Sequence, residues 1–326
     1  MNNLMNCTQE EKNISDVWSP NVVLALGISQ MITNLVSAAF NCYVIFTIAF
    51  SKDLTKYIFI LFCNLAVSDL LASLSGLWIS LLFISDPDST IFGSWKILIA
   101  YVSYTISILS TVYNLVSIGI ERYLAVSGGS WSKCRVSKNQ ILSAVFVIWT
   151  VAIILGSLPL MGWDCLRKDG NVSTLYGPFC IDYLVFITIP NCIVAFVFPL
   201  ITYSGIILIL RKQKLCMLAH GQHDHGTYKA AEIQVAKTCI FIWILAIVSY
   251  APFFAGVLWD VINTICPEEL QTSVFVFRNL TAMMITLNSL GNPVIYTLKF
   301  KTLSNSCVFC RCQPSNQVSA LTLEDA

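Results

Sequence analysis

Hydrophobic residues gather in long runs that are separated by short polar links. Seven runs are long enough to cross a bilayer, because a membrane-spanning helix needs about 20 predominantly apolar residues. They cover residues 22–50, 58–84, 97–125, 141–161, 183–210, 233–261 and 270–298. No internal repeat and no soluble domain is visible between them. The pattern predicts an all-α membrane protein, a bundle of seven transmembrane helices.

The segments on either side of the seven runs are polar. Residues 1–21 include charged residues and no apolar core, so we expect an N-terminal segment outside the membrane and not a signal peptide. Residues 299–311 are amphipathic, which is typical of a short helix on the membrane surface. The chain thus divides into an N-terminal segment (1–21), the bundle (22–298), and a surface helix with a short cytoplasmic tail (299–326).

Composition supports a membrane protein and excludes one class of partner. The chain is 56% hydrophobic and 11% charged, whereas soluble domains carry about 25% charged residues. The formal net charge of +1 argues against a nucleic-acid-binding protein.

The basic residues of the links predict the orientation. With the N-terminus outside, twelve lysines and arginines of the links and tail lie on the inner side and three on the outer side. Cytoplasmic loops are enriched in these residues, so this orientation is favoured. The glycosylation sequons that start at Asn6, Asn13 and Asn171 fall on the outer side as well. We therefore expect a glycosylated, multi-pass protein of the plasma membrane with an extracellular N-terminus.

The seventh run carries polar residues that are costly inside a bilayer. Asn288, Ser289, Asn292 and Pro293 lie within it. An unsatisfied polar group in hydrocarbon costs about 2–7 kcal/mol, and proline frees a carbonyl one turn back. This helix is therefore expected to be bent and to pack against neighbours that offer polar partners.

Asp69 is an ionisable residue in the middle of the second run, which makes it a functional candidate. Together with hydroxyl and amide residues of the third and seventh runs it would form a hydrated site for a monovalent cation such as sodium. The alternative is a protonated Asp69 that is only hydrogen-bonded to Asn292. The residues of this candidate sodium site are Asp69, Ser107, Thr111, Asn288, Ser289 and Asn292.

Glu121-Arg122-Tyr123 closes the third run at the inner face, and Glu232 begins the sixth run on the same side. An Arg122–Glu232 ion pair would tie the two helices together and would break if the sixth helix moved outward. Such a two-state contact is what a switch requires. The alternative is an Arg122 side chain that extends to the lipid headgroups.

Taken together, the motifs resemble the rhodopsin-like G-protein-coupled receptors. Each run carries one signature in the expected order, and the residues are Asn41, Leu65-Ala66 with Asp69, Glu121-Arg122-Tyr123, Trp149, Pro199, Pro252, and Asn292-Pro293 with Tyr296. The resemblance implies coupling to a heterotrimeric G protein, with arrestin and receptor kinases as further partners, and no enzymatic activity. It implies that the switch residues are Glu121, Arg122, Tyr123, Glu232, Tyr250, Pro252, Asn292, Pro293 and Tyr296.

Within the family, the stretches 157–165, 236–238 and 287–298 are most similar to the lysophospholipid receptors, with the cannabinoid receptors close by. Most of the family has a cysteine where this chain has Ile97. The lipid-receptor branch instead closes a disulfide within the second outer link, which implies a Cys165–Cys180 bond here. Two relay positions also depart from the family: Tyr250 replaces a tryptophan and Ile207 replaces a tyrosine.

The resemblance also directs attention to a ligand pocket in the outer half. Lysophospholipid receptors hold the phosphate with an arginine and a neighbouring glutamate or glutamine, but the matching residues here are Ala100 and Tyr101. Arg278 and Lys96 are the candidates to replace that arginine. The expected pocket is apolar and aromatic, which suits a lipid. Its residues are Lys96, Tyr101, Tyr104, Thr105, Ile108, Phe253, Phe254, Leu258 and Arg278, with Asp260 near the rim.

Several alternatives remain open. The same residues would form bundle core in a receptor with constitutive or weak signalling, or would hold a non-lipid molecule such as a nucleoside. A seven-helix transporter is disfavoured because no repeat is visible. A zinc hydrolase is disfavoured because all three histidines lie in the link between the fifth and sixth runs. Cys307, Cys310 and Cys312 follow the surface helix and are candidates for palmitoylation.

Overall fold

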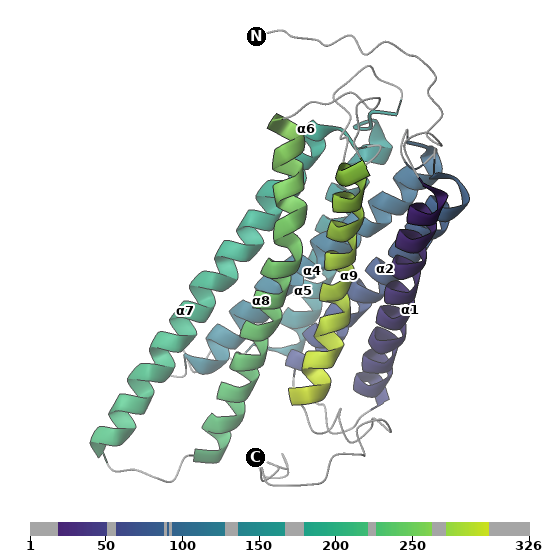
Figure 1. Cartoon of the computed structure of the whole chain (residues 1–326). Helices are drawn as coiled ribbons and strands as arrows, with labels where there is room; N and C mark the ends of the chain where they lie inside the picture. Colours follow the sequence, from purple (N-terminus) through teal and green to yellow (C-terminus); the bar gives the residue numbers. More distant parts are fainter. Residues whose placement is uncertain are drawn as a thin grey trace, which may run out of the picture.

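The computed structural model describes residues 19–50, 57–87, 90, 93–127, 136–166, 179–220, 226–262 and 272–299. Seven long helices form one bundle there (Figure 1). They are α1 (Pro20–Phe50), α2 (Ile58–Ser85), α4 (Trp95–Val126), α5 (Lys138–Ser157), α7 (Ile189–His220), α8 (Gly226–Ile262) and α9 (Thr272–Lys299). The short elements are η2 (Leu158–Met161), α6 (Ile181–Tyr183) and the π-helical turn η3 (Leu184–Thr188), which leads into α7. The predicted all-α, seven-helix fold is confirmed.

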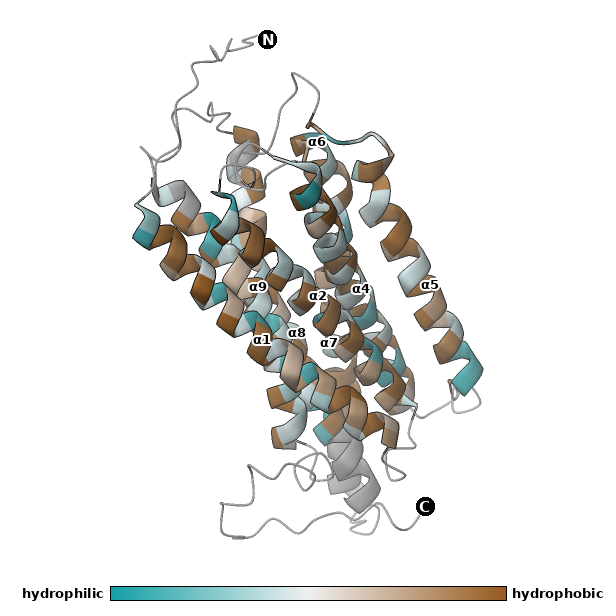
Figure 2. Cartoon of the chain, turned by 90° about the vertical axis from the view of Figure 1, so that its right-hand side faces the viewer, coloured by the Kyte–Doolittle hydropathy of each residue, from teal (hydrophilic) through white to brown (hydrophobic). Residues whose placement is uncertain are grey.

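Length and composition allow six of these helical segments to cross a membrane. The exception among the described residues is α9, because Arg278, Asn279, Asn288 and Asn292 lower its hydropathy. Large apolar side chains are exposed on the outside of the bundle, for example Leu35 of α1 and Phe146 of α5. Figure 2 shows hydrophobic residues predominating on the visible faces of α1 and α5. A bilayer is the environment that such faces require.

Local sequence explains where some elements begin. The Ser137 hydroxyl accepts from the Gln140 backbone, and the Gln140 side chain accepts from the Ser137 backbone, so a capping box starts α5. The Ser94 hydroxyl accepts the Ile97 amide hydrogen at the start of α4. Gly162 has a φ of 102°, which suits glycine, and this residue ends η2.

Polar side chains connect helices across the bundle. The indole of Trp149 in α5 donates to Asn64 Oδ1 in α2 at 2.8 Å. Asn114 of α4 donates to the Leu61 carbonyl of α2 at 2.8 Å. Asn41 of α1 donates to the Ser289 carbonyl of α9 at 3.0 Å. These bonds fix helix positions where the hydrophobic effect between helices is weak.

The two ends of the bundle carry different structural features. At one end α1 begins, α2 terminates, and α6 lies close to the end of α8 (Figure 1). We call it the disulfide end, because Cys165 and Cys180 lie there. Arg122, close to the end of α4, lies at the opposite end, the Arg122 end. The predicted sequons at Asn6, Asn13 and Asn171 and the cysteines Cys307, Cys310 and Cys312 lie outside the described residues. Of the predicted surface helix 299–311 only Lys299 is described, as the last residue of α9.

Candidate ligand site and switch residues

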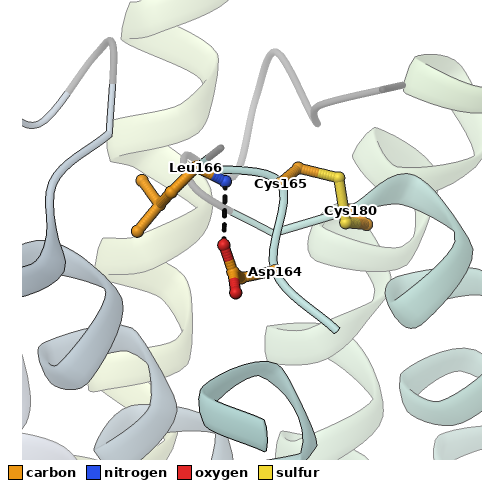
Figure 3. Close-up of a disulfide and its surroundings, with 4 residues drawn as sticks. All are labelled: Asp164, Cys165, Leu166 and Cys180. Atoms are coloured by element: carbon orange, nitrogen blue, oxygen red, sulfur yellow. Dashed lines mark hydrogen bonds between the residues drawn. A yellow bond between two sulfur atoms is a disulfide. The ribbon is translucent and has the colours of Figure 1, made fainter. Parts of the chain in front are cut away.

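A disulfide lies over the bundle at the disulfide end. It joins Cys165 to Cys180 with their Cα atoms 5.2 Å apart, so the predicted bond is present. Asp164 Oδ1 accepts the Leu166 amide hydrogen at 3.1 Å beside it (Figure 3). An isolated antiparallel bridge pairs Asp164 with Phe179. The disulfide and this bridge bring Phe179 onto the bundle, where its ring lies 5.8 Å from that of Tyr101.

Beneath Phe179 lies a cavity of about 520 Å³, counting its open mouth. We call it the apolar chamber, because almost all the surface that it presents is carbon. It lies between α4, η3, α8 and α9, where the sequence predicted a pocket. It is lined by Tyr101, Tyr104, Thr105, Ile108, Phe179, Leu184, Thr188, Phe253, Arg278, Thr281, Ala282 and Ile285.

A second cavity of about 580 Å³, counted in the same way, lies between α1, α2, α4 and α9. We call it the polar chamber, because eight of its twelve lining residues carry polar side chains, although carbon makes up most of the surface that it presents. Tyr101, Tyr104, Arg278 and Ala282 border both chambers. The polar chamber is lined by Gln30, Asn34, Gly76, Ile79, Phe83, Thr90, Tyr101, Tyr104, Arg278, Asn279, Ala282 and Thr286.

Arg278 is the cation between the two chambers, and it is only 9% exposed. Its guanidinium donates to the Tyr101 hydroxyl and to the Thr90 carbonyl, the latter at 3.4 Å. The guanidinium carbon also lies 5.5 Å from the centroid of the Tyr101 ring. Among the described residues no carboxylate forms an ion pair with Arg278. A buried cation held by neutral groups is well suited to bind an anion, since charged partners prefer to be paired in a low-dielectric site.

The structure separates the predicted ligand residues into two groups. Tyr101, Tyr104, Thr105, Ile108, Phe253 and Arg278 line the apolar chamber. Phe254 packs against Phe253 and Phe196 behind that wall. Leu258 is 52% exposed and Lys96 is exposed, and neither lines a chamber. The side chain of Asp260 lies outside the described residues.

The polar chamber was missed in the sequence. Gln30 and Asn34 are spaced by four residues in the first run, so they lie on one face of a helix. That spacing is a usable signal for a polar surface inside a membrane protein. Asn279 belongs to a sequon within the seventh run, and in the structure its Oδ1 accepts from Gln30 at 2.7 Å.

Asp69 is fully buried between α2 and α9. Its Oδ2 accepts from Asn292 Nδ2 at 2.7 Å, and Thr111 and Ser289 also lie beside the carboxylate. The other carboxylate oxygen, the Oδ1 of Asn292 and both polar side-chain atoms of Asn288 have no hydrogen-bond partner within the described residues. Ser107 donates to the Tyr104 carbonyl at 2.6 Å. The predicted sodium residues thus supply several unpaired oxygen atoms around one buried carboxylate.

The Arg122 end carries the predicted switch residues. Arg122 is bound by Glu121 at two points, Nε to Oε2 at 2.5 Å and Nη2 to Oε1 at 2.6 Å. Glu232 is in α8, but its side chain lies outside the described residues, so the Arg122–Glu232 pair stays a prediction. Tyr123 packs against Gly205 of α7, where an added Cβ would come within 2.8 Å of the ring.

The aromatic residues of the relay are buried. Tyr250 is buried, with its ring 6.3 Å from that of Phe196, and it lies two residues before Pro252, which is inside α8. The Tyr296 ring lies 4.8 Å from that of Phe62, close after Pro293 in α9. These contacts place Tyr250 and Tyr296 in the core that joins α2, α7, α8 and α9.

The order of the helices and the motifs within them identify the family. A family profile described as "7 transmembrane receptor (rhodopsin family)" matches residues 40–296. The chain belongs to the rhodopsin family of seven-transmembrane receptors. It is therefore a multi-pass membrane protein of a class of receptors and not of enzymes.

Individual relatives agree with this assignment. The chain is 27% identical to lysophosphatidic acid receptor 1-A of Xenopus laevis over 316 residues, which cover 95% of this chain and 82% of that protein. It is 26% identical to lysophosphatidic acid receptor 1 of Homo sapiens, over 90% of this chain and 77% of that protein. It is also 26% identical to cannabinoid receptor 1 of Xenopus laevis, over 68% and 49%. The predicted similarity to the lysophospholipid and cannabinoid branch is confirmed.

The fold has a solved counterpart. The crystal structure of squid rhodopsin superposes with a TM-score of 0.73, at 18% identity and over 88% of this chain and 85% of that one. At this identity the likeness concerns the arrangement of the helices alone.

Proposed function

We propose that this rhodopsin-family chain is a plasma-membrane receptor for an extracellular lipid with an anionic headgroup, and that ligand binding activates a heterotrimeric G protein. The observation that carries the proposal is Arg278, a buried cation at the border of an apolar chamber. The relatives named as lysophosphatidic acid receptors support the ligand class.

The geometry suits an amphiphile. The apolar chamber would take an acyl chain between Ile108, Phe253 and Ile285, because ligand sites are mostly apolar with a few orienting polar groups. The guanidinium would bind a phosphate with two parallel hydrogen bonds. The Tyr101 hydroxyl, which already accepts from Arg278, would keep the guanidinium at the chamber border.

Signalling would begin from the Glu121–Arg122 pair. With the N-terminus extracellular, the Arg122 end faces the cytoplasm. The ligand would favour a packing in which the inner half of α8 moves outward and exposes Arg122 to the G protein. Arrestin and receptor kinases would bind the same inner side. Replacing Glu232 with alanine should raise basal signalling at equal surface expression; an unchanged basal signal would show that Glu232 does not restrain Arg122.

We further infer that the carboxylate of Asp69 holds a sodium ion together with Asn288, Ser289 and Thr111. Hard cations prefer oxygen ligands. Asp69 and Asn288 each offer an unpaired oxygen atom, and the hydroxyls of Ser289 and Thr111 lie beside the carboxylate. The ion would favour one packing of α2 against α9. Its role would be allosteric, because it lies below the ligand chambers.

A lipid panel tests the proposal. The full-length receptor would be assayed for G-protein activation with oleoyl-lysophosphatidate, the uncharged oleoyl-glycerol and a nucleoside. We expect activation by the phosphate lipid and at least tenfold weaker activation by the uncharged lipid, since about 1.4 kcal/mol corresponds to tenfold. Equal responses to the two lipids would contradict an anionic headgroup, and a response only to the nucleoside would replace the lipid hypothesis.

A further inference from the structure

The polar chamber has no place in the proposed function, since an acyl chain and a phosphate need only the apolar chamber and Arg278. Its walls come from α1 and α2 as well as α9, and α9 contacts both of these helices. Figure 1 shows α9 beside α1 and α2. Polar groups inside a membrane bundle are expensive, so a chamber lined by them calls for a reason.

Amide and hydroxyl groups of α1 and α9 form a connected hydrogen-bond network there. Gln30 donates to Asn279 Oδ1 at 2.7 Å, and Asn34 donates to the Gln30 carbonyl at 2.9 Å. The single hydroxyl hydrogen of Thr286 is within reach of the Ala282 carbonyl at 3.2 Å and of Asn34 Oδ1 at 3.3 Å. The side-chain oxygens Asn279 Oδ1 and Asn34 Oδ1 each have a second lone pair, and the Thr286 hydroxyl can also accept. The Gln30 carbonyl is already shared with the backbone of its own helix. The network is therefore internally bonded and still able to bind hydroxyl groups.

Two further features point to a ligand. Tyr104 borders both chambers and is more than nine-tenths buried, and its hydroxyl, which lies beside Thr286, forms no hydrogen bond of normal geometry within the described residues. Gly76 of α2 leaves room for the Asn34 amide, since an added Cβ would lie 2.4 Å from Asn34 Oδ1. The absence of a side chain at Gly76 in α2 thus makes space for the Asn34 amide at the wall of the chamber.

We propose that the polar chamber binds a hydroxyl-rich, uncharged group attached to the phosphate of the lipid, as in an inositol or glycerol phosphodiester. This proposal rests on the proposed function. The phosphate lies at Arg278, the acyl chain extends into the apolar chamber, and the hydroxyl-rich group extends between α1, α2 and α9. Inositol and glycerol offer the same chemistry, namely several hydroxyls that both donate and accept.

The charge of the chamber excludes a cationic headgroup. Arg278 is the charged residue among those that line it, and no lining residue is acidic. A choline group would therefore lie close to a buried cation without a carboxylate to neutralise it, which is unfavourable. The receptor should discriminate against lysophosphatidylcholine in favour of the uncharged headgroups.

The test compares lipids with one acyl chain and different headgroups. Binding to the full-length receptor in nanodiscs would be measured by ligand-dependent thermal stabilisation for the oleoyl forms of lysophosphatidylinositol, lysophosphatidylglycerol, lysophosphatidylcholine and lysophosphatidate. We expect the inositol or the glycerol lipid to bind about tenfold more tightly than lysophosphatidate, as one or two additional hydrogen bonds would give. The choline lipid should bind more weakly than all three.

Two variants locate the effect. Thr286→Val removes one hydroxyl at nearly constant shape, and Ile79→Phe adds bulk in the polar chamber only. Both variants should abolish the preference for the inositol or glycerol lipid over lysophosphatidate. The affinity for lysophosphatidate itself should stay within about threefold of the original receptor, and this binding would show that the variants fold. Thr105→Val, which lines only the apolar chamber, is the control and should keep the preference.

The outcomes distinguish the two proposals. If lysophosphatidate binds as well as the inositol and glycerol lipids, the polar chamber only joins the helices, and the proposed function stands. If the preference survives in Ile79→Phe, the headgroup lies elsewhere. If none of the anionic lipids binds, the proposed function fails and this inference fails with it.

Discussion

Replacing Arg278 should separate anionic from neutral ligands. Arg278→Gln keeps a side chain of similar length that can donate hydrogen bonds, but it removes the charge. Arg278 is 9% exposed and borders the apolar chamber, so water would compensate little for the loss of its charge. A hydrogen bond to a charged group contributes about 1.5–3 kcal/mol, which corresponds to about 10- to 150-fold in affinity.

The neighbouring residues provide a graded series. Tyr101→Phe keeps the ring beneath the guanidinium and removes the hydroxyl that accepts from it. The loss of one neutral partner, about 0.5–1.5 kcal/mol, should weaken anionic ligands by about 2- to 12-fold. Lys96→Gln is the matched control, because Lys96 is exposed and lines neither chamber. It should change affinity by less than about threefold, since exposed charges contribute little.

The assay is competition binding on membranes, with oleoyl-lysophosphatidate and uncharged oleoyl-glycerol compared on each variant at equal surface expression. We expect the order of losses Arg278→Gln, then Tyr101→Phe, then Lys96→Gln for the anionic lipid, and no loss for the uncharged lipid. Equal losses for both lipids in Arg278→Gln would mean that Arg278 only supports the fold. A larger loss in Lys96→Gln than in Arg278→Gln would refute the assignment of the headgroup site.

Three further predictions concern the bundle. Trp149→Phe removes the 2.8 Å hydrogen bond to Asn64 and should lower the stability of the bundle by about 0.6–1.7 kcal/mol, measured as a lower melting temperature in detergent. The control is Thr150→Val, because Thr150 is exposed and its hydroxyl bonds only to its own helix; it should leave the melting temperature unchanged. Cys165→Ala, alone or combined with Cys180→Ala, removes the disulfide, whose two cysteines are separated by 15 residues in the sequence. Its loss should lower the free energy of unfolding by about 3 kcal/mol and weaken ligand binding. Cys42→Ala, at a free cysteine, is the control. Equal melting curves for Cys165→Ala and Cys42→Ala would contradict a structural disulfide. Asp69→Asn should remove the thermal stabilisation by sodium over N-methylglucamine, which at ten times the dissociation constant amounts to about 1.4 kcal/mol; a sodium effect that persists in this variant would place the ion elsewhere.

Much of the fold follows from the sequence because a bilayer imposes a simple length rule. The run 58–84 became α2 (Ile58–Ser85), and the run 22–50 became α1 (Pro20–Phe50). The start of α5 lies three residues before the predicted run 141–161, because the capping box at Ser137 extends the helix into polar residues. The π-helical turn η3 has no counterpart in the hydrophobic pattern, since it depends on backbone packing and not on residue type.

The ligand site was less predictable because it depends on how each helix is rotated. Arg278 and Lys96 both lie near the ends of apolar runs, and the sequence gives no reason to prefer either. In the structure Arg278 lies on the face of α9 that also carries Thr281, Ala282 and Ile285, whereas Lys96 is exposed in the first turn of α4. Leu258 was expected in the pocket, but it follows the buried Val257, and one residue of rotation turns it outward.

The position of the cation explains why the two chambers exist side by side. The family resemblance places Ala100 at the position where lysophospholipid receptors have their phosphate-binding arginine. In this chain Ala100 is fully buried in α4. Ala100 lines neither chamber, whereas the adjacent Tyr101 lines both. A cation on α9 instead approaches the ligand from the side of α1 and α2, where Gln30, Asn34 and Asn279 form the amide surface. In the proposed binding mode, a charge on α9 and not on α4 would turn the headgroup toward these amides, which is consistent with a hydroxyl-rich headgroup.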